Sequence, residues 1–115
     1  MNLFLIRHAT AVNYLSSTND INRILSKEGI LQAKKLNEYL LNVNLKITEI
    51  YISNSLRTIQ TAKLVIPKSK DQKRIILPDL YLASFHDLLN FINQLNTKND
   101  ILIIGHNDGI SKLAS

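Results

Sequence analysis

The chain has 115 residues, of which 45% are hydrophobic and 6% aromatic, and its formal net charge is +5. This length suits a single domain over residues 1–115 with an aliphatic core. Cysteine is absent, which excludes a disulfide scaffold and a cysteine-ligated metal site. The apolar start is too short for a signal peptide or a membrane span, so we expect a soluble, cytoplasmic protein with no membrane partner.

The positive charge does not by itself indicate a nucleic-acid binder. The lysines are scattered, and the one basic cluster, residues 67–74 (PKSKDQKR), includes an aspartate and has no aromatic side chains for base stacking. We therefore expect no nucleic-acid partner. The excess positive charge suits a phosphorylated or acidic substrate instead.

The first quarter of the chain predicts a strand, a loop and a helix. Residues 3–6 are a continuous apolar run, which is typical of a strand covered on both faces. Residues 9–25 are polar and rich in turn formers, which predicts a loop. Ser26 then precedes a helical stretch and can cap its first turn. Its buried stripe is expected to contain Ile30, Ala33, Leu36 or Asn37, and Leu40.

Residues 49–53 predict a second strand, after which Ser53 is expected to cap a second helix that ends at Pro67. Residues 74–77 predict a third strand. The stripe of the second helix is expected to be Leu56, Ile59, Ala62, Val65 and Ile66.

Ser84 and Asp87 predict the start of a third helix. Residues 101–104 predict a fourth strand, and a turn over residues 105–109 leads to a last helix from Ile110. The stripe of the third helix is expected to be Phe85, Leu88, Leu89, Ile92 and Leu95, and His86 beside it is expected to be a surface residue.

This alternation predicts an α/β fold with three layers, α/β/α, around a mostly parallel open sheet. Ligands bind beyond the carboxyl ends of the strands in such sheets. Basic side chains follow three of the four predicted strands: Arg7 and His8, then Arg57, then His106. A histidine at one strand end is more often structural, but together these residues predict one shared rim. A cation in the first turn of a helix is unfavourable unless an anion binds there, so Arg57 predicts a phosphate site.

Three segments of the chain, LIRHATA (5–11), SNSLRTIQTA (53–62) and ILIIGHNDG (101–109), resemble the signature segments of the histidine phosphatase superfamily in the family's order. Residues 22–33 (NRILSKEGILQA) also resemble a stretch of the small phosphohistidine phosphatases of the SixA type. The resemblance covers nearly the whole chain. It implies a phosphoglycerate mutase-like fold.

The resemblance implies that His8 is a nucleophile that forms a phosphohistidine intermediate. Arg7, Arg57 and a protonated His106 would surround the phosphoryl oxygens. The chemistry agrees, because a neutral imidazole can attack phosphorus when a backbone carbonyl holds its other nitrogen. Two guanidiniums can each bind a phosphate through two hydrogen bonds. No metal and no other cofactor is expected.

The identity of the general acid stays open at this point. The resemblance implies Asp79, which follows the third strand, although an aspartate after Pro78 is equally typical of a turn. Asp108 is a second candidate and could instead cap the last helix. A phosphohistidine substrate relaxes the need for an acid, because imidazole is a better leaving group than an alkoxide. In mutases an asparagine lines the substrate pocket, and the resemblance implies that Asn13 binds substrate in the same way. Asn13 lies one residue short of the spacing that mutases show.

Mutases carry a long insertion after the third strand, and here only residues 80–83 separate Asp79 from Ser84. An open site favours a phosphorylated protein as the substrate. We therefore expect a SixA-type protein phosphohistidine phosphatase. The alternatives are a small phosphomonoester as substrate, or an inactive phosphate-binding module. Relatives continue beyond the helix that follows His106, which implies either a minimal version or a C-terminally truncated sequence. The sequence predicts no oligomeric state.

Overall fold

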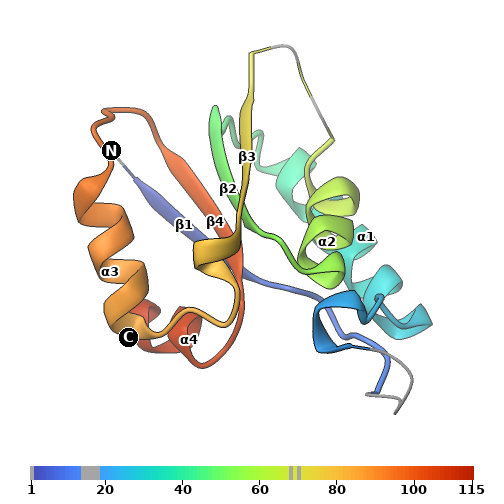
Figure 1. Ribbon diagram of the computed structural model, residues 1–115. Coiled ribbons are helices and arrows are strands. Elements are labelled where there is room, and N and C mark those ends of the chain that lie inside the picture. Colours follow the sequence, from blue (N-terminus) through green and yellow to red (C-terminus); the bar gives the residue numbers. More distant parts are fainter. Residues whose placement is uncertain (1, 14–18, 68, 70) are drawn as a thin grey trace.

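The computed structural model of the protein describes residues 2–13, 19–67, 69 and 71–115. Its strands are β1 (Leu3–Arg7), β2 (Glu49–Ser53), β3 (Lys73–Leu77) and β4 (Ile101–Gly105). Its helices are α1 (Lys27–Asn42), α2 (Leu56–Val65), α3 (Phe85–Gln94) and α4 (Gly109–Ala114), with 3-10 turns η1 (Asp20–Asn22) and η2 (Pro78–Leu80). This order confirms the predicted alternation of strands and helices (Figure 1).

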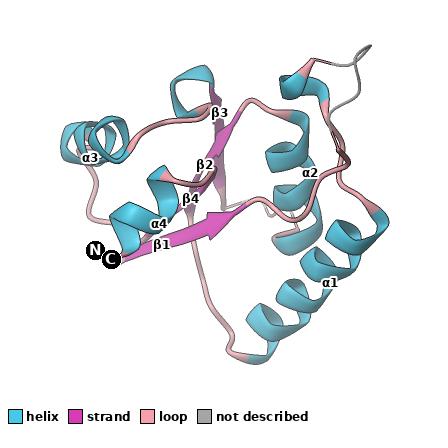
Figure 2. Ribbon diagram, turned by 90° about the horizontal axis from the view of Figure 1, so that it is seen from below, coloured by secondary structure: helices cyan, strands magenta, loops and turns pink. Residues whose placement is uncertain are grey.

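The four strands form one sheet in the order β1-β4-β2-β3, and every pair is parallel. Helices α1 and α2 lie on one side of the sheet, and α3 and α4 lie on the other (Figures 1 and 2). The predicted three-layer α/β fold is therefore confirmed. The chain that follows β4 turns to one face of the sheet and forms α4. The chains that follow β1 and β2, the two neighbours of β4, turn to the other face and lead to α1 and α2. This arrangement opens a crevice at the carboxyl ends of β1, β4 and β2.

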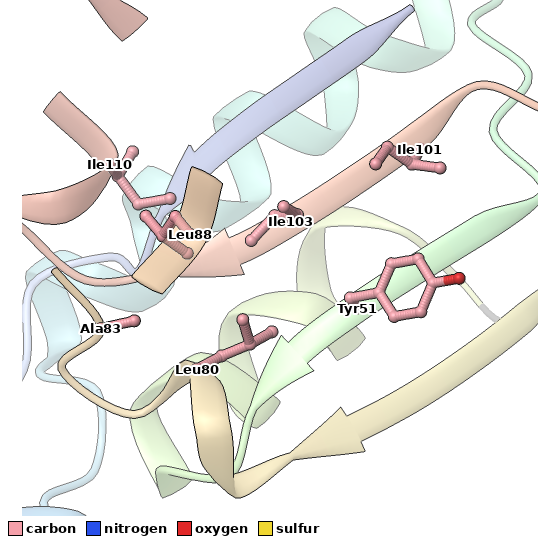
Figure 3. Packing of buried hydrophobic residues seen from close by; sticks show 7 residues of the cluster. All are labelled: Tyr51, Leu80, Ala83, Leu88, Ile101, Ile103 and Ile110. Atoms are coloured by element: carbon pink, nitrogen blue, oxygen red, sulfur yellow. The ribbon is translucent and has the colours of Figure 1, made fainter. Parts of the chain in front are cut away.

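The core lies on both faces of β4. Ile101 and Ile103 pack with Tyr51, Leu80 and Leu88 under α3 and α4 (Figure 3). On the opposite face, a second cluster of buried residues packs under α2: Ile47, Ile50, Ile52, Ala62, Leu102 and Ile104. Residues 101–104 are fully buried, which explains why this strand is apolar throughout.

Helix α1 packs on the protein through most of the predicted stripe, with Ala33 buried and Leu36 and Leu40 packed against the same cluster, but Ile30 does not join it. Ile30 is 37% exposed, and its neighbour Gly29 is buried together with Ala33. A Cβ atom at position 29 would lie 2.0 Å from the carbonyl oxygen of Thr10, so only glycine fits this close approach. The segment after β1 thus packs directly on the backbone of α1.

Helices α2 and α3 each expose one residue of the predicted stripe. Leu56 and Leu89 are 36% and 37% exposed, so their predicted burial is wrong. Leu56 is the first residue of α2, and the face of this helix toward the strand ends is partly polar, with Arg57, Thr58, Thr61, Ala62 and Val65 buried. In α3, Phe91 packs against the core in addition to the residues predicted.

Two of the three predicted N-caps are confirmed. The side chain of Ser26 accepts a hydrogen bond from the Gly29 N–H, and Ser84 forms a capping box with Asp87. The cap of α2 is Ser55, however, and not Ser53. Ser53 ends β2 with its side chain in the interior, so the helix starts two residues later than expected. The extended conformation of Ile66 ends α2 before Pro67, as predicted.

Parts of two predicted features lie outside the described residues. These are residues 14–18 of the predicted loop over 9–25, and residues 68 and 70 of the basic cluster. The described part of the loop contains η1 and an antiparallel bridge between Ala11 and Leu25. His86 is exposed, as predicted. No helix within the described ranges is long and apolar enough to cross a lipid bilayer.

Candidate active site

A cleft of about 420 Å³ lies where β1, β4 and β2 end. It is lined by Arg7, His8, Asp20, Arg23, Arg57, Leu82, His106 and Asn107. Residues 7 and 105 are register partners in neighbouring strands, which places the residues that follow them side by side. The structure therefore brings together the four basic side chains that the sequence analysis selected.

His8 follows β1 with its ring fixed in one tautomer. Its Nδ1 atom lies 2.6 Å from the carbonyl oxygen of Ala9, so Nδ1 carries the hydrogen and donates it. The lone pair is then on Nε2, which faces the cleft residue Arg57 at 3.3 Å. Burial lowers the pKa of His8 below 6.5, and the positive charges of Arg57 and Arg7 act in the same direction. His8 is therefore a neutral imidazole at pH 7.

Thr61 links the segment around His8 to helix α2. The Ala9 N–H donates to Thr61 Oγ1 over 3.0 Å, and Thr61 Oγ1 in turn donates to the carbonyl oxygen of Arg57 over 2.8 Å. Thr61 is 1% exposed. The residue that fixes the His8 tautomer is thus hydrogen-bonded to the helix that carries Arg57.

Arg57 lies in the first turn of α2, and its side chain is only 2% exposed. Its Nε donates toward Nε2 of His8 over 3.3 Å, and its Nη2 lies 3.4 Å from Nδ1 of His106. The opposite edge of the guanidinium contacts Asp20, with Nη1 2.7 Å from the carbonyl oxygen and Nη2 3.0 Å from Oδ2. The plane of this side chain is therefore fixed on both sides.

His106 follows β4 and is 3% exposed. Its Nε2 lies 2.8 Å from Oγ of Ser53, and its Nδ1 faces the donor Nη2 of Arg57. Nδ1 is consequently the acceptor, and Nε2 donates its hydrogen to Ser53. Burial, with the charges of Arg57 and His8, lowers the pKa of His106 to about 4. In the absence of a bound anion, this lowered pKa favours the neutral ring at pH 7.

The other predicted site residues are placed differently. Arg7 lines the cleft with an exposed side chain. Asp79 is exposed in η2, and Asp108 is exposed at the N-cap position of α4 without a capping hydrogen bond from its side chain. Asn13 is also exposed. Asp79, Asp108 and Asn13 are not among the residues that line the cleft.

The sequence analysis missed three side chains at this site: Asp20, Arg23 and Tyr81. Asp20 accepts from Arg57 and, through Oδ1, from Nε of Arg23 over 3.0 Å. The Tyr81 hydroxyl donates to Asp20 Oδ2, and its ring meets that of His106 edge-on at 5.4 Å between centroids. The Tyr81 hydrogen bond, followed by the contact with Arg57, lowers the pKa of Asp20. Arg23 lies in the segment 22–33 that resembles SixA-type phosphatases, and this resemblance was the one signal in the sequence that could have identified it as a site residue.

The model of the histidine phosphatase superfamily (branch 1) matches residues 3–88. The chain belongs to this superfamily. Its segments around His8 and Arg57 fall within the matched range, and His106 reaches the same cleft from β4. A search of curated proteins finds no match to this member.

Solved structures of several proteins with phosphatase names have the same fold. A protein from Agrobacterium tumefaciens with the provisional name phosphohistidine phosphatase SixA gives a TM-score of 0.89 at 20% identity, over 97% of this chain and 73% of that one. The protein histidine phosphatase SixA in complex with tungstate gives 0.83 at 20% identity, over 99% and 74%. The alpha-ribazole phosphatase from Shigella flexneri gives 0.76 at 20% identity, over 99% and 78%.

Proposed function

We propose that this histidine phosphatase superfamily member hydrolyses phosphohistidine on proteins, in two steps, with His8 as nucleophile. The observation that carries the proposal is the tautomer of His8: Nδ1–H is held by the Ala9 carbonyl, and the lone pair of Nε2 points at the Arg57 guanidinium. A neutral imidazole with one oriented lone pair is what attack on phosphorus requires.

The phosphoryl group would bind between the two imidazoles and the guanidinium of Arg57. In the first step Nε2 of His8 bonds to phosphorus while the bond from phosphorus to the leaving ring nitrogen breaks. That nitrogen keeps the electron pair, and the other nitrogen of the substrate ring keeps its proton, so a neutral imidazole leaves. In the second step a water oxygen bonds to phosphorus, and the bond to Nε2 breaks with its electron pair returning to Nε2. Inorganic phosphate leaves with the two protons of the water, and His8 is again the neutral Nδ1–H tautomer. Arg57 and Arg7 would stabilise charge on the equatorial oxygens in both steps.

His106 would contribute a second contact to the phosphoryl oxygens. Its pKa of about 4 reflects burial beside a cation, and a phosphoryl dianion at Nδ1 would favour the protonated form instead. The hydrogen bond from Nε2 to Ser53 holds the ring in place for either state.

The carboxylates support a substrate with a good leaving group. Among the described residues that line the cleft, Asp20 is the only carboxylate. It is paired with Arg57 and Arg23 and has a lowered pKa, so it is a poor proton donor. Asp79 and Asp108 are exposed outside the cleft. An alkyl phosphate needs an acid to protonate its departing alkoxide, whereas an imidazole leaves without one. A phosphorylated histidine on a protein therefore suits this site better than an alkyl phosphomonoester.

The test compares three substrates on the same enzyme: a protein phosphorylated on histidine with phosphoramidate, p-nitrophenyl phosphate, and O-phosphoserine. We expect the phosphohistidine protein to be hydrolysed fastest and the alkyl ester slowest. Comparable rates for O-phosphoserine would favour the small-molecule phosphomonoesterase alternative. Phosphate binding without turnover of any substrate would instead identify a phosphate-binding module.

Two controls complete this experiment. His8→Ala should abolish turnover, and appreciable residual activity would exclude His8 as the nucleophile. Activity should persist in EDTA, because the proposed chemistry uses no metal, and its loss would contradict that part of the proposal.

A further inference from the structure

The guanidinium of Arg57 has two edges that can each form a pair of hydrogen bonds. The inner edge, Nε with Nη2, faces Nε2 of His8 and Nδ1 of His106 at 3.3 and 3.4 Å. The outer edge, Nη1 with Nη2, faces Asp20, whose carbonyl oxygen and Oδ2 lie at 2.7 and 3.0 Å. The two edges therefore contact different groups, and the proposed phosphoryl position is beside the inner edge alone.

We propose that Asp20 is a positioning residue, which grips the outer edge of Arg57 so that the inner edge is presented to the two histidines. This inference rests on the proposed function, because it assigns Asp20 to the same phosphate site. Two hydrogen bonds on one edge of a planar group fix both its position and its rotation. A charged acceptor makes one of these bonds strong.

Asp20 is itself held from several directions, as a positioning residue must be. Its Oδ1 accepts from Nε of Arg23, and its carbonyl oxygen accepts from the Arg23 N–H over 3.1 Å. The hydroxyl of Tyr81, from the segment between β3 and α3, donates to Oδ2. The segment that follows β1 and the one that follows β3 thus meet on Arg57, which itself follows β2.

A competing idea is that the Asp20 carboxylate occupies the place of the phosphate and must leave when substrate binds. The two ideas predict opposite changes in oxyanion affinity when Asp20 is replaced. If Asp20 competes, its removal strengthens the binding of an oxyanion. If Asp20 positions Arg57, its removal weakens that binding, because the inner edge is no longer held in place. The contacts on separate edges favour the second outcome.

The experiment measures binding of tungstate and of inorganic phosphate to the full chain by isothermal titration calorimetry. We expect Asp20→Ala to weaken binding by about tenfold, the scale of one strong hydrogen bond to a charged group. Asp20→Asn should be intermediate, because its amide oxygen can still accept from Nη2. Asp71→Asn removes an exposed carboxylate outside the cleft and serves as the matched control. Tyr81→Phe tests the support of Asp20 without removing its charge.

A double-mutant cycle separates positioning from a general loss of stability. In an Arg57→Lys background there is no planar guanidinium for Asp20 to position. Asp20→Asn should then change oxyanion affinity by less than about threefold. Unchanged or tighter binding by Asp20→Ala and Asp20→Asn would overturn the proposal, and so would an equal loss with and without Arg57. Since binding is measured without turnover, positioning by Asp20 can hold even if no phosphatase activity is found.

Discussion

Nε2 of His8 lies 3.3 Å from Nε of Arg57, although the two residues are 49 positions apart in the chain. The contact joins the lone pair of a neutral imidazole to a buried cation. It exists because Ala9 fixes the other nitrogen of the ring, and because Thr61 ties Ala9 to the helix of Arg57. Under the proposed function, a phosphoryl group that reacts with His8 would replace this contact, and the cation would lie beside the reacting atoms from the start.

Replacing Arg57 by lysine should reduce kcat/KM by roughly 100- to 1,000-fold, the usual effect of losing a donor to transition-state charge. One ammonium cannot contact Asp20 and both histidines at once. Lysine therefore keeps the positive charge but loses the arrangement of hydrogen-bond donors that the guanidinium provides. Steady-state kinetics with the phosphohistidine protein give the measurement. Arg74→Lys, on β3 and outside the cleft, is the matched control. If Arg57→Lys lowers kcat/KM by less than tenfold, the fixed geometry of the Arg57 guanidinium is not important for turnover.

The pH dependence of kcat/KM should reflect the protonation of His8. Its folded pKa is lowered, so the neutral, reactive form predominates above that value and is lost as the pH falls through it. We expect activity to fall along an acidic limb whose midpoint lies below the ordinary histidine value of about 6.5. Rates measured between pH 4 and 8 locate this limb. A midpoint at or above 6.5 would show that burial and the neighbouring arginines do not control His8.

Removing the hydroxyl of Ser53 should slow turnover without dismantling the fold. Ser53→Ala leaves Nε2–H of His106 without its acceptor, so the ring loses its fixed orientation, and we expect about a tenfold lower kcat. Ser55→Ala is the matched control, because Ser55 is equally buried but caps α2. That variant should lose about 1 kcal/mol of stability and keep its kcat. Equal kinetic effects from the two substitutions would contradict the role of Ser53.

Gly29→Ala should destabilise the protein by roughly 1 to 3 kcal/mol, since the added methyl group collides with the Thr10 carbonyl oxygen. Urea denaturation followed by circular dichroism measures the change. Leu31→Ala, at a position that is 61% exposed on the same helix, is the control and should stay within about 0.5 kcal/mol. A Gly29→Ala variant as stable as the control would mean that α1 can move away from the segment after β1.

The convergence of His8, Arg57 and His106 could be predicted because each residue follows a strand that its apolar sequence identifies. Parallel strands end at the same edge, so residues that follow them meet without further information. Asp20 and Tyr81 could not be found in this way. Both lie in connecting segments without periodicity, and only the packing of those segments brings them to Arg57.

Local helix signals were ambiguous where burial decides the outcome. Ser53 and Ser55 are both acceptable caps by residue type, and the buried contact with His106 commits the first of them to the site. The apolar pattern of α2 also misplaced Leu56, because the face toward the cleft carries Arg57 and Thr61. Two of the failed predictions, the cap at Ser53 and the burial of Leu56, lie next to the candidate site, where polar side chains interrupt the ordinary hydrophobic pattern.

The strand β4 is the last of the four along the chain, yet it lies between β1 and β2 in the sheet. A ribosome therefore releases both neighbours of β4 before the strand that joins them. Until residues 101–105 emerge, β1 has no hydrogen-bonded partner, and the nascent chain exposes the apolar surface that β4 will cover. His106 emerges directly after that strand, so the last strand of this sheet and the last of the basic side chains that line the candidate site become available in one step, after the other three strands have been synthesised.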